Sequence, residues 1–221
     1  MQLFTVLDEE QLEMMLAAFH KLKWKDGKGS AKGSAQKIKN NHQAFPTDDA
    51  FEPITNIIEK TIFKSKVKDY AYAKEIVGLR ANKYSVGQTY GWHVDMPHMN
   101  GKRTDMSFTL FLSDPETYEG GELMMKELGS SIRVKPKAGQ LVIYPTGVLH
   151  QVSPVTKGER LAVVGWIESF VPDDDARASL YNFSRIMIKM RSLIDTNGKV
   201  DQKTFDFMNQ TYLQLIRKLS R

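Results

Sequence analysis

The hydrophobic pattern of residues 72 to 169 repeats every second residue, and this feature restricts the fold more than any other. Phe108, Leu110 and Leu112 are spaced two apart, and Ile132 and Val134 repeat that spacing. Side chains two residues apart lie on the same face of a β-strand. Turn sequences separate the apolar runs: Glu119-Gly-Gly, Ala138-Gly, Pro145-Thr-Gly and Lys157-Gly. Many short strands at this spacing predict an antiparallel sandwich or jelly roll.

Apolar residues at helical spacing lie on both sides of this region. Near the N-terminus, a short strand is expected at 3–7, followed by a helix with Asp8 as its N-cap and Gln11 as the reciprocal partner. A second helix is expected at about 50–65, and further helices after Pro172. The expected fold class is therefore α+β: a jelly-roll core flanked by N-terminal and C-terminal helices.

The change of period divides the chain into three expected parts. Residues 1–71 form a support region of helix and strand, residues 72–170 the jelly-roll domain, and residues 171–221 the C-terminal helices. Two apolar stripes mark the last part: Leu180, Phe183, Met187 and Met190, then Phe205, Met208, Tyr212, Leu215 and Leu219. Core packing against the sheet is the expected use of both stripes, and a homodimer interface is the alternative.

The composition excludes several classes of site. The chain has no cysteine, which excludes disulfides, thiolate metal sites, Fe–S clusters and cysteine nucleophiles. Hydrophobic residues make up 41% and charged residues 26%, values typical of a soluble globular protein. No apolar run approaches the roughly 18 residues of a membrane span, and the N-terminal residues lack the pattern of a secretory signal. A cytoplasmic location without a membrane partner is therefore expected.

The net charge of +5 is unevenly distributed along the chain. Between residues 21 and 40 a single acid, Asp26, is set against seven lysines: Lys21, Lys23, Lys25, Lys28, Lys32, Lys37 and Lys39. One interpretation is a contact with an acidic or phosphorylated partner, and the other is a solvated loop rich in Gly and Ser. The second is favoured, and a nucleic-acid partner is not expected, because aromatic residues do not interleave with the lysines as a nucleic-acid platform would need.

Four residues together predict a non-haem iron site. His93 and Asp95 are two apart in an expected strand, so both side chains can bind one metal ion. His150 follows a buried-looking strand and supplies a third ligand, which completes a two-His-one-carboxylate face. Arg160 is expected across a hairpin from His150, pointing into the same sandwich. A buried arginine requires an anion, and a bound dicarboxylate would supply one with bidentate geometry.

Residues 78–170 resemble the Fe(II)/2-oxoglutarate-dependent dioxygenases, and most closely the PKHD-type hydroxylases, relatives of prolyl and lysyl hydroxylases. The segments that carry the resemblance are Asn82-Lys-Tyr84, Tyr90-Gly-Trp-His-Val-Asp95, Arg103-Thr-Asp105, Thr109-Leu-Phe-Leu-Ser-Asp114, Tyr118-Glu-Gly-Gly-Glu-Leu123, Tyr144-Pro-Thr-Gly-Val-Leu-His150, Val152-Ser-Pro-Val155 and Gly158-Glu-Arg160. The resemblance implies a double-stranded β-helix, Fe(II) bound by two histidines and an aspartate, and 2-oxoglutarate and dioxygen as co-substrates.

The resemblance also implies roles for single residues, beginning with His93, Asp95 and His150 as iron ligands. Arg160 would pair with the distal carboxylate of 2-oxoglutarate, and Tyr84 would donate a hydrogen bond to the same group.

The same pattern implies positions for three further residues. Trp166 resembles an aromatic residue of the co-substrate pocket, with core packing as the equal alternative. Arg103 resembles an arginine that contacts peptide substrates. His98 is expected in a loop that faces the substrate, without binding the metal.

The reaction that this resemblance implies is hydroxylation of a substrate coupled to oxidative decarboxylation of 2-oxoglutarate. Peptidyl proline or lysine is the expected substrate, and ascorbate (vitamin C) an expected requirement. Two alternatives stay open. One is the same chemistry on a nucleic acid or a small molecule, and the other is a non-catalytic sensor that binds metal or 2-oxoglutarate on the same fold.

Overall fold

The core of the molecule is a pair of antiparallel sheets in the computed structural model, which describes residues 1–127, 129–197 and 201–221. The larger sheet contains, in spatial order, β1 (Gln2–Thr5), β13 (Gln140–Pro145), β9 (Met106–Phe111), β16 (Arg160–Ser169), β5 (Ala73–Tyr84), β4 (His42–Ala44) and β2 (Lys25–Asp26). The smaller sheet contains β12 (Ser130–Val134), β11 (Leu123–Glu127), β14 (His150–Val152), β6 (Thr89–His93) and β3 (Lys39–Asn40). This architecture confirms the predicted α+β fold with a jelly-roll core.

Short elements complete the described chain. Two small strand pairs are β10 (Glu119–Gly120) with β15 (Val155–Lys157), and β7 (His98–Met99) with β8 (Lys102–Arg103). The shortest helices are η1 (Gly27–Ser30), α2 (Ser34–Lys37), η2 (Asp49–Phe51) and η3 (Pro115–Thr117). None of the helices in the described residues combines the length and the apolar composition that crossing a membrane requires.

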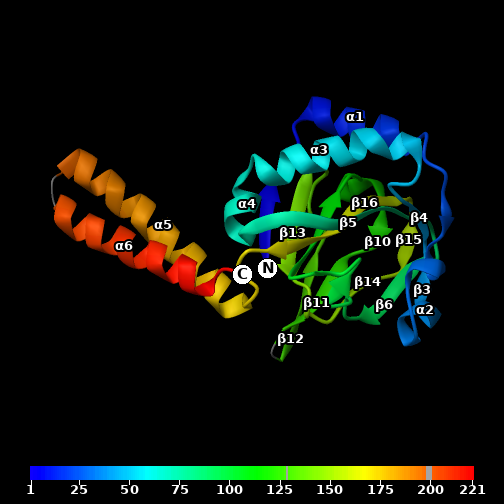
Figure 1. The fold of residues 1–221 in the computed structure, drawn as a ribbon. Helices are drawn as coiled ribbons and strands as arrows, with labels where there is room; N and C mark the ends of the chain where they lie inside the picture. Colours follow the sequence, from blue (N-terminus) through cyan, green and yellow to red (C-terminus); the bar gives the residue numbers. More distant parts are fainter. Residues whose placement is uncertain (128, 198–200) are drawn as a thin grey trace.

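Helices α1 (Glu9–Phe19) and α3 (Glu52–Phe63) cover the outer face of the larger sheet, and α4 (Lys66–Ala71) follows α3 (Figure 1). Ile54, Ile58 and Ile62 recur every four residues on α3 and are completely buried, so one helical face carries the contact. The predicted capping box of α1 is confirmed, because Asp8 accepts from the backbone N–H of Gln11 and the Gln11 side chain accepts from that of Asp8.

Strand β9 is buried along its whole length because both of its faces are covered. Phe108 and Leu110 belong to the apolar cluster beneath α1 and α3. Ser107 and Thr109, on the opposite face, line a cavity between the two sheets. The core therefore lies on the helix side of the larger sheet, and the polar face of the same sheet is left for a site.

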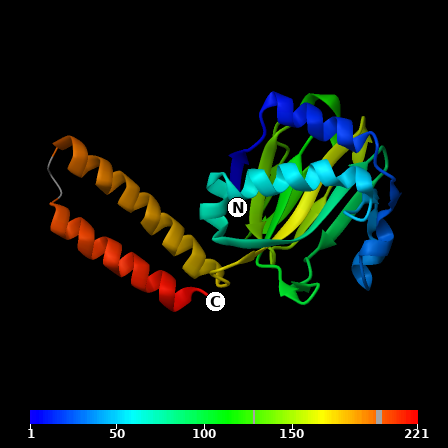
Figure 2. The ribbon, with the colours of Figure 1, turned by 45° about the horizontal axis from the view of Figure 1, so that its top comes forward.

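Helices α5 (Asp174–Asn197) and α6 (Gln202–Leu219) form an antiparallel pair that projects away from the sheets (Figures 1 and 2). Phe183 of α5 contacts Tyr212 of α6, with ring centroids 5.8 Å apart, and the Tyr212 hydroxyl lies 2.8 Å from that of Tyr72 at the base of the pair. No residue of α6 is buried. The prediction that both C-terminal stripes pack against the sheet is therefore wrong, because the two helices pack on each other.

Candidate iron and co-substrate site

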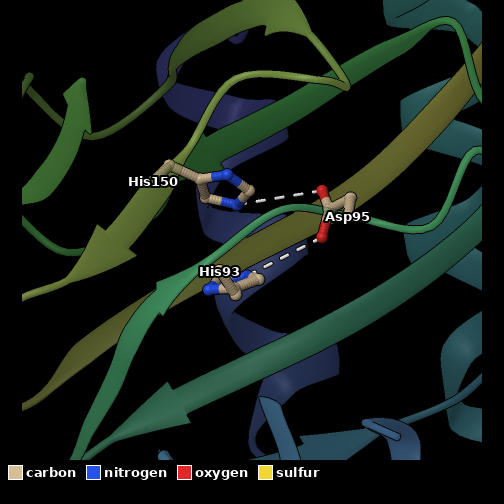
Figure 3. A group of neighbouring side chains, drawn as sticks. All are labelled: His93, Asp95 and His150. Atoms are coloured by element: carbon tan, nitrogen blue, oxygen red, sulfur yellow. Dashed lines mark ion pairs between the residues drawn. The ribbon is translucent and has the colours of Figure 1, made fainter. Parts of the chain in front are cut away.

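His93, Asp95 and His150 come together between the two sheets, with one ligand atom of each within 4.8 Å of the others (Figure 3). His93 is the last residue of β6 and lies directly opposite His150, the first residue of β14. The Nε2 atom of His93 is 3.7 Å from Asp95 Oδ1, and the Nε2 atom of His150 is 3.8 Å from Asp95 Oδ2. The predicted ligand residues are thus close enough to hold one ion.

Backbone carbonyls set the tautomer of both histidines. The Nδ1 atom of His93 lies 2.7 Å from the carbonyl oxygen of Gly91, and the Nδ1 atom of His150 lies 2.9 Å from that of Val148. A carbonyl oxygen can only accept, so each Nδ1 carries the proton and each Nε2 keeps its lone pair for a metal. Burial, and next the neighbouring His150, lower the pKa of His93 to about 4, so this ring is neutral at pH 7.

Two donors hold the carboxylate of Asp95. The indole N–H of Trp166 donates to Oδ2 over 2.9 Å, and the Ser107 hydroxyl donates to the same oxygen over 2.8 Å. Both donors come from the larger sheet, from β16 and β9. Two imidazole Nε2 atoms and one oriented carboxylate on the same side of a space are the donor set of non-haem Fe(II) oxygenases, so these residues fit an iron ion.

Arg160 is the most deeply buried charged side chain near this cluster, at 1% exposure. Its guanidinium carbon lies 5.4 Å from the ring centroid of Tyr84 and 4.8 Å from that of Phe111. None of its three guanidinium nitrogens has a hydrogen-bond partner in the described chain. A buried cation without a counter-ion costs several kcal/mol, so the geometry favours an anion with two acceptor oxygens at this position.

The position of Arg160 differs from the hairpin that the sequence suggested. Its strand β16 belongs to the larger sheet, while the strand of His150 belongs to the smaller one, and Arg160 pairs with Tyr84 of β5. The hairpin prediction is therefore wrong. Both residues nevertheless line one cavity, because that cavity lies between the sheets.

The cavity contains every residue of the predicted site: Tyr84, His93, Asp95, His150, Arg160 and Trp166 all line it. Burial raises the pKa of the Tyr84 hydroxyl, which keeps this group protonated and able to donate. Trp166 is buried, lines the cavity and donates its indole N–H to Asp95, so its ring faces the site. The arrangement can hold a metal on one wall and a carboxylate beside Arg160.

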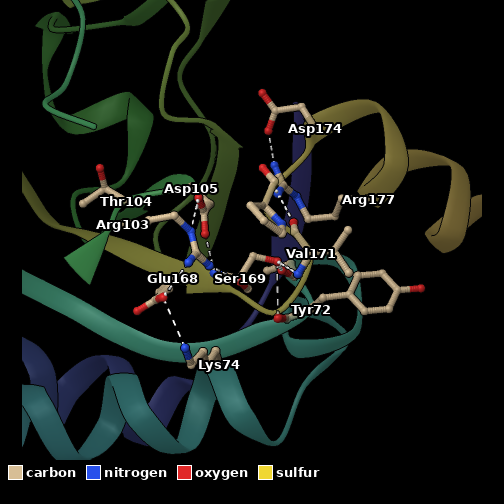
Figure 4. A network of polar contacts seen from close by, with 12 residues as sticks. Tyr72, Lys74, Arg103, Thr104, Asp105, Glu168, Ser169, Val171, Asp174 and Arg177 are labelled. Atoms are coloured by element: carbon tan, nitrogen blue, oxygen red, sulfur yellow. Dashed lines mark hydrogen bonds and ion pairs between the residues drawn. The ribbon is translucent and has the colours of Figure 1, made fainter. Parts of the chain in front are cut away.

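Arg103 lies in a separate polar network (Figure 4). Its Nη1 is 3.1 Å from Glu168, its Nε is 3.3 Å from Asp105, and its Nη2 donates to the carbonyl oxygen of Ser169. Lys74 also pairs with Glu168, over 3.2 Å. Arg103 does not line the cavity, so the structure assigns it to this network and gives no support to contact with a peptide.

Sequence reasoning missed Ser107, Lys39 and Arg80, which also line the cavity. For Arg80 a signal was present: Arg80, Asn82 and Tyr84 are two apart on one strand and must share a face. Ser107 and Lys39 carry no such signal, because their places depend on the order of strands in each sheet.

Solved structures of similar fold include a prolyl-4-hydroxylase of Pseudomonas putida, with a TM-score of 0.56 and 19% identity over 76% of this chain and 91% of that one. A viral collagen prolyl hydroxylase of Paramecium Bursaria Chlorella virus-1, solved with 2OG, has a TM-score of 0.53 and 22% identity over 76% and 95%. At these identities the likeness shows the fold alone.

Comparison of the sequence with known proteins identifies the family of this chain. The sequence model of the 2OG-Fe(II) oxygenase superfamily matches residues 79–168. A PKHD-type hydroxylase of Prochlorococcus marinus is 38% identical over 97% of this chain and 96% of its own length. Another from Synechococcus is 38% identical over 90% and 88%. The chain therefore belongs to the PKHD-type hydroxylases and is an enzyme of the Fe(II)- and 2-oxoglutarate-dependent dioxygenase class.

Proposed function

We propose that this enzyme hydroxylates a peptidyl proline or lysine and couples the reaction to oxidative decarboxylation of 2-oxoglutarate. One observation carries the proposal: the cavity that contains the His93, Asp95 and His150 donor set also contains the unpartnered guanidinium of Arg160. One oxygen atom of dioxygen enters the substrate as a hydroxyl group. The other enters succinate, and carbon dioxide leaves.

Each side chain of the site has its own role in this reaction. The two Nε2 lone pairs and the Asp95 carboxylate hold Fe(II), which supplies dioxygen activation when bound. Trp166 and Ser107 keep Asp95 oriented. Arg160 binds the distal carboxylate of 2-oxoglutarate by a bidentate pair, and the protonated Tyr84 hydroxyl donates to the same group. Burial of this end excludes water from the co-substrate.

The choice of a peptidyl substrate rests on the relatives. The Pseudomonas putida protein of similar fold is named a prolyl-4-hydroxylase, and another is a prolyl hydroxylase of Trichoplax adhaerens in complex with a peptide fragment. An open groove beside His93 and Asp95 is compatible with a chain segment as ligand. We assign residues 72–170 to the catalytic domain, 1–71 to its support and 171–221 to the C-terminal helices.

Three further features of the enzyme are predicted: the use of ascorbate, the oligomeric state and the location in the cell. Ascorbate is expected to sustain turnover by keeping the iron reduced. A homodimer is favoured by exposed apolar side chains on the helical pair, among them Ile186, Ile188 and Phe207. A cytoplasmic location is the expectation from the composition.

The proposal is tested by adding 2-oxoglutarate to the Fe(II)-loaded protein without oxygen and recording the visible spectrum. Chelation of the metal is expected to produce a metal-to-ligand charge-transfer band. The band is expected to be absent in His93→Ala, and Arg160→Gln is expected to need about tenfold more 2-oxoglutarate to reach it. Arg133→Gln is the matched control, because Arg133 is exposed on β12 and does not line the site.

A second measurement separates catalysis from sensing. Succinate is expected to form when oxygen is admitted, and Asp95→Ala is expected to form none above the metal-free background. Succinate production by Asp95→Ala at the wild-type rate would overturn the assignment of the iron site. A charge-transfer band without succinate in the wild type would favour the sensor.

A further inference from the structure

A groove continues from the iron site to the surface, with a cavity volume of about 470 Å³. Arg80, Tyr90, His93, Asp95 and Trp166 line both the groove and the inner cavity, so the two spaces join at the metal. This volume lies within the range of clefts that hold drug-sized ligands, roughly 300–1,000 Å³. The groove is therefore the place where the second substrate can reach the iron.

Arg80 stands at the junction of the groove and the cavity. Its guanidinium carbon lies 4.7 Å from the ring centroid of Trp166, and that ring in turn donates to Asp95. In the part of the chain that the structure describes, the half-buried Arg80 side chain forms no hydrogen bond or ion pair. Its guanidinium donors are therefore available to a ligand.

Arg160 lies at one end of the β5–β16 strand pair, and Arg80 lies near its middle. Arg160 pairs with Tyr84 of β5, and Arg80 of β5 pairs with Val164 of β16. Four residues separate the two positions along the strands, which corresponds to about 13 Å. Arg160, at the fully buried position, fits the distal carboxylate of the co-substrate. Arg80, at the position that lines the groove, is left for a second anion.

The charge of the groove supports an anionic ligand. Its lining contains two cations, Arg80 and Lys32, and one carboxylate, Asp95, which is expected to bind the metal. Its apolar lining includes Trp92 and Met96. The lining of the groove is more polar than apolar, and a guanidinium in such a groove suits a carboxylate within a larger molecule.

A nucleic acid fits this surface less well. Of the lysines in 21–40, Lys32 lines the groove, whereas Lys39 is buried and donates to the Ser30 hydroxyl over 2.7 Å. Lys23 and Lys25 border a different hollow beside Asp48. These four lysines therefore lie on separate surfaces and form no continuous track that could follow a phosphate backbone.

We propose that the second substrate is an acidic peptide whose Asp or Glu carboxylate pairs with Arg80 while a neighbouring residue lies at the iron. This inference rests on the proposed function and names its substrate class. Beyond Arg80, the groove is lined by Trp92, Met96 and Met99, whose side chains can contact residues next to the reacting one. Arg80 thereby sets specificity, and the metal site sets the chemistry.

The test uses the full chain loaded with Zn(II) and 2-oxoglutarate, which binds substrate without turnover. Two fluorescent peptide pools are compared by anisotropy, each centred on proline or lysine with three randomised neighbours on either side. One pool contains Asp and Glu, and the other Asn and Gln in their place. We expect the wild type to bind the acidic pool about tenfold more tightly, the effect of one charge-assisted pair.

Variants assign that preference to Arg80. Arg80→Gln is expected to reduce the preference to about twofold or less, Arg80→Lys to retain part of it, and Arg133→Gln to leave it unchanged. Equal binding of both pools by the wild type, or an undiminished preference in Arg80→Gln, overturns the proposal. Arg80-dependent binding of single-stranded DNA or of free amino acids, without binding of the acidic pool, overturns it as well.

The same proteins separate this inference from the proposed function. Arg80→Gln is expected to keep the Fe(II)–2-oxoglutarate charge-transfer band and a thermal midpoint close to that of Arg133→Gln. A missing band in the wild type refutes the proposed function. If the wild type, Arg80→Gln and Arg133→Gln all show the band but the wild type does not discriminate between the pools, the role of Arg80 is refuted and the proposed function is not.

Discussion

Trp166 contributes to the site through its indole N–H as well as through its ring. Trp166→Phe keeps an aromatic ring in the cavity and removes the 2.9 Å hydrogen bond to Asp95. Groups that orient a metal ligand typically affect metal affinity about 10- to 100-fold, so we expect Fe(II) to bind at least about tenfold more weakly. Anaerobic titration with Fe(II) measures the change. Trp24→Phe is the control, since Trp24 packs on Phe19 away from the site.

Lys39 makes the stability of the folded protein depend on pH. Burial first, and then the charge of Arg80, lower the pKa of Lys39 from 10.5 to about 7. Between those values the unfolded chain holds a proton that the folded chain lacks. The free energy of unfolding therefore rises with pH across this window, by about 1.4 kcal/mol per unit. Below pH 7 both states are protonated and the contribution is flat.

Lys39→Met is expected to remove this rise, because methionine has no proton to lose. The free energy of unfolding of both proteins is measured with urea at pH 7, 8.5 and 10. The difference between their two slopes against pH isolates the effect of Lys39 from that of tyrosines that titrate in the same pH range. Identical slopes would show that Lys39 holds its proton when folded.

At the scale of elements, Gly165 permits the close contact of β16 with its neighbours. A Cβ atom there would lie 2.5 Å from Cζ of Phe108 and 2.7 Å from the carbonyl oxygen of Gly78. Gly165→Ala is therefore expected to destabilise the protein by about 2 to 3 kcal/mol. Gly147→Ala is the matched control: a Cβ atom at Gly147 meets nothing within 4 Å. Denaturant unfolding measures both, and equal midpoints would contradict this packing.

Local signals predicted the elements better than their partners. The cap of α1 was predictable because Asp8 and Gln11 are three residues apart and bond to each other's backbone. The apolar stripe of α6 correctly predicted a helix. It could not tell whether a sheet, α5 or another molecule covers that stripe, because periodicity describes one face only. The hairpin expected between His150 and Arg160 was wrong for a similar reason, because the strands β14 and β16 belong to different sheets.

At the scale of the whole molecule, the site combines a local motif with contacts that only the fold creates. His93 and Asp95 were predictable as a pair from their spacing, but the expected strand is too long: β6 ends at His93, and Asp95 lies just beyond it. Their relation to Ser107 and Trp166 depends on how the smaller sheet lies over the larger one, which no spacing encodes. The composition predicted a lysine-rich segment, and the fold spread those lysines over separate surfaces.

Because His93 and His150 lie on the smaller sheet and Arg160 on the larger, bound metal and co-substrate would join the two sheets. Ligands that bind only the folded state stabilise it, by about 2.7 kcal/mol at a hundredfold excess over the dissociation constant. For a chain of this length, that corresponds to a thermal midpoint raised by roughly 5–10 °C. Calorimetry under anaerobic conditions is expected to show this rise with Fe(II), and a further rise with 2-oxoglutarate.

The variants distinguish the two ligands in the same experiment. His93→Ala is expected to lose both increments, because 2-oxoglutarate needs the metal as well as Arg160. Arg160→Gln is expected to keep the increment from Fe(II) and lose about half of that from 2-oxoglutarate, and a chelator should reverse both in the wild type. A full response of His93→Ala to Fe(II) would place the metal elsewhere, whereas a full 2-oxoglutarate increment in Arg160→Gln would show that the buried guanidinium does not hold the co-substrate.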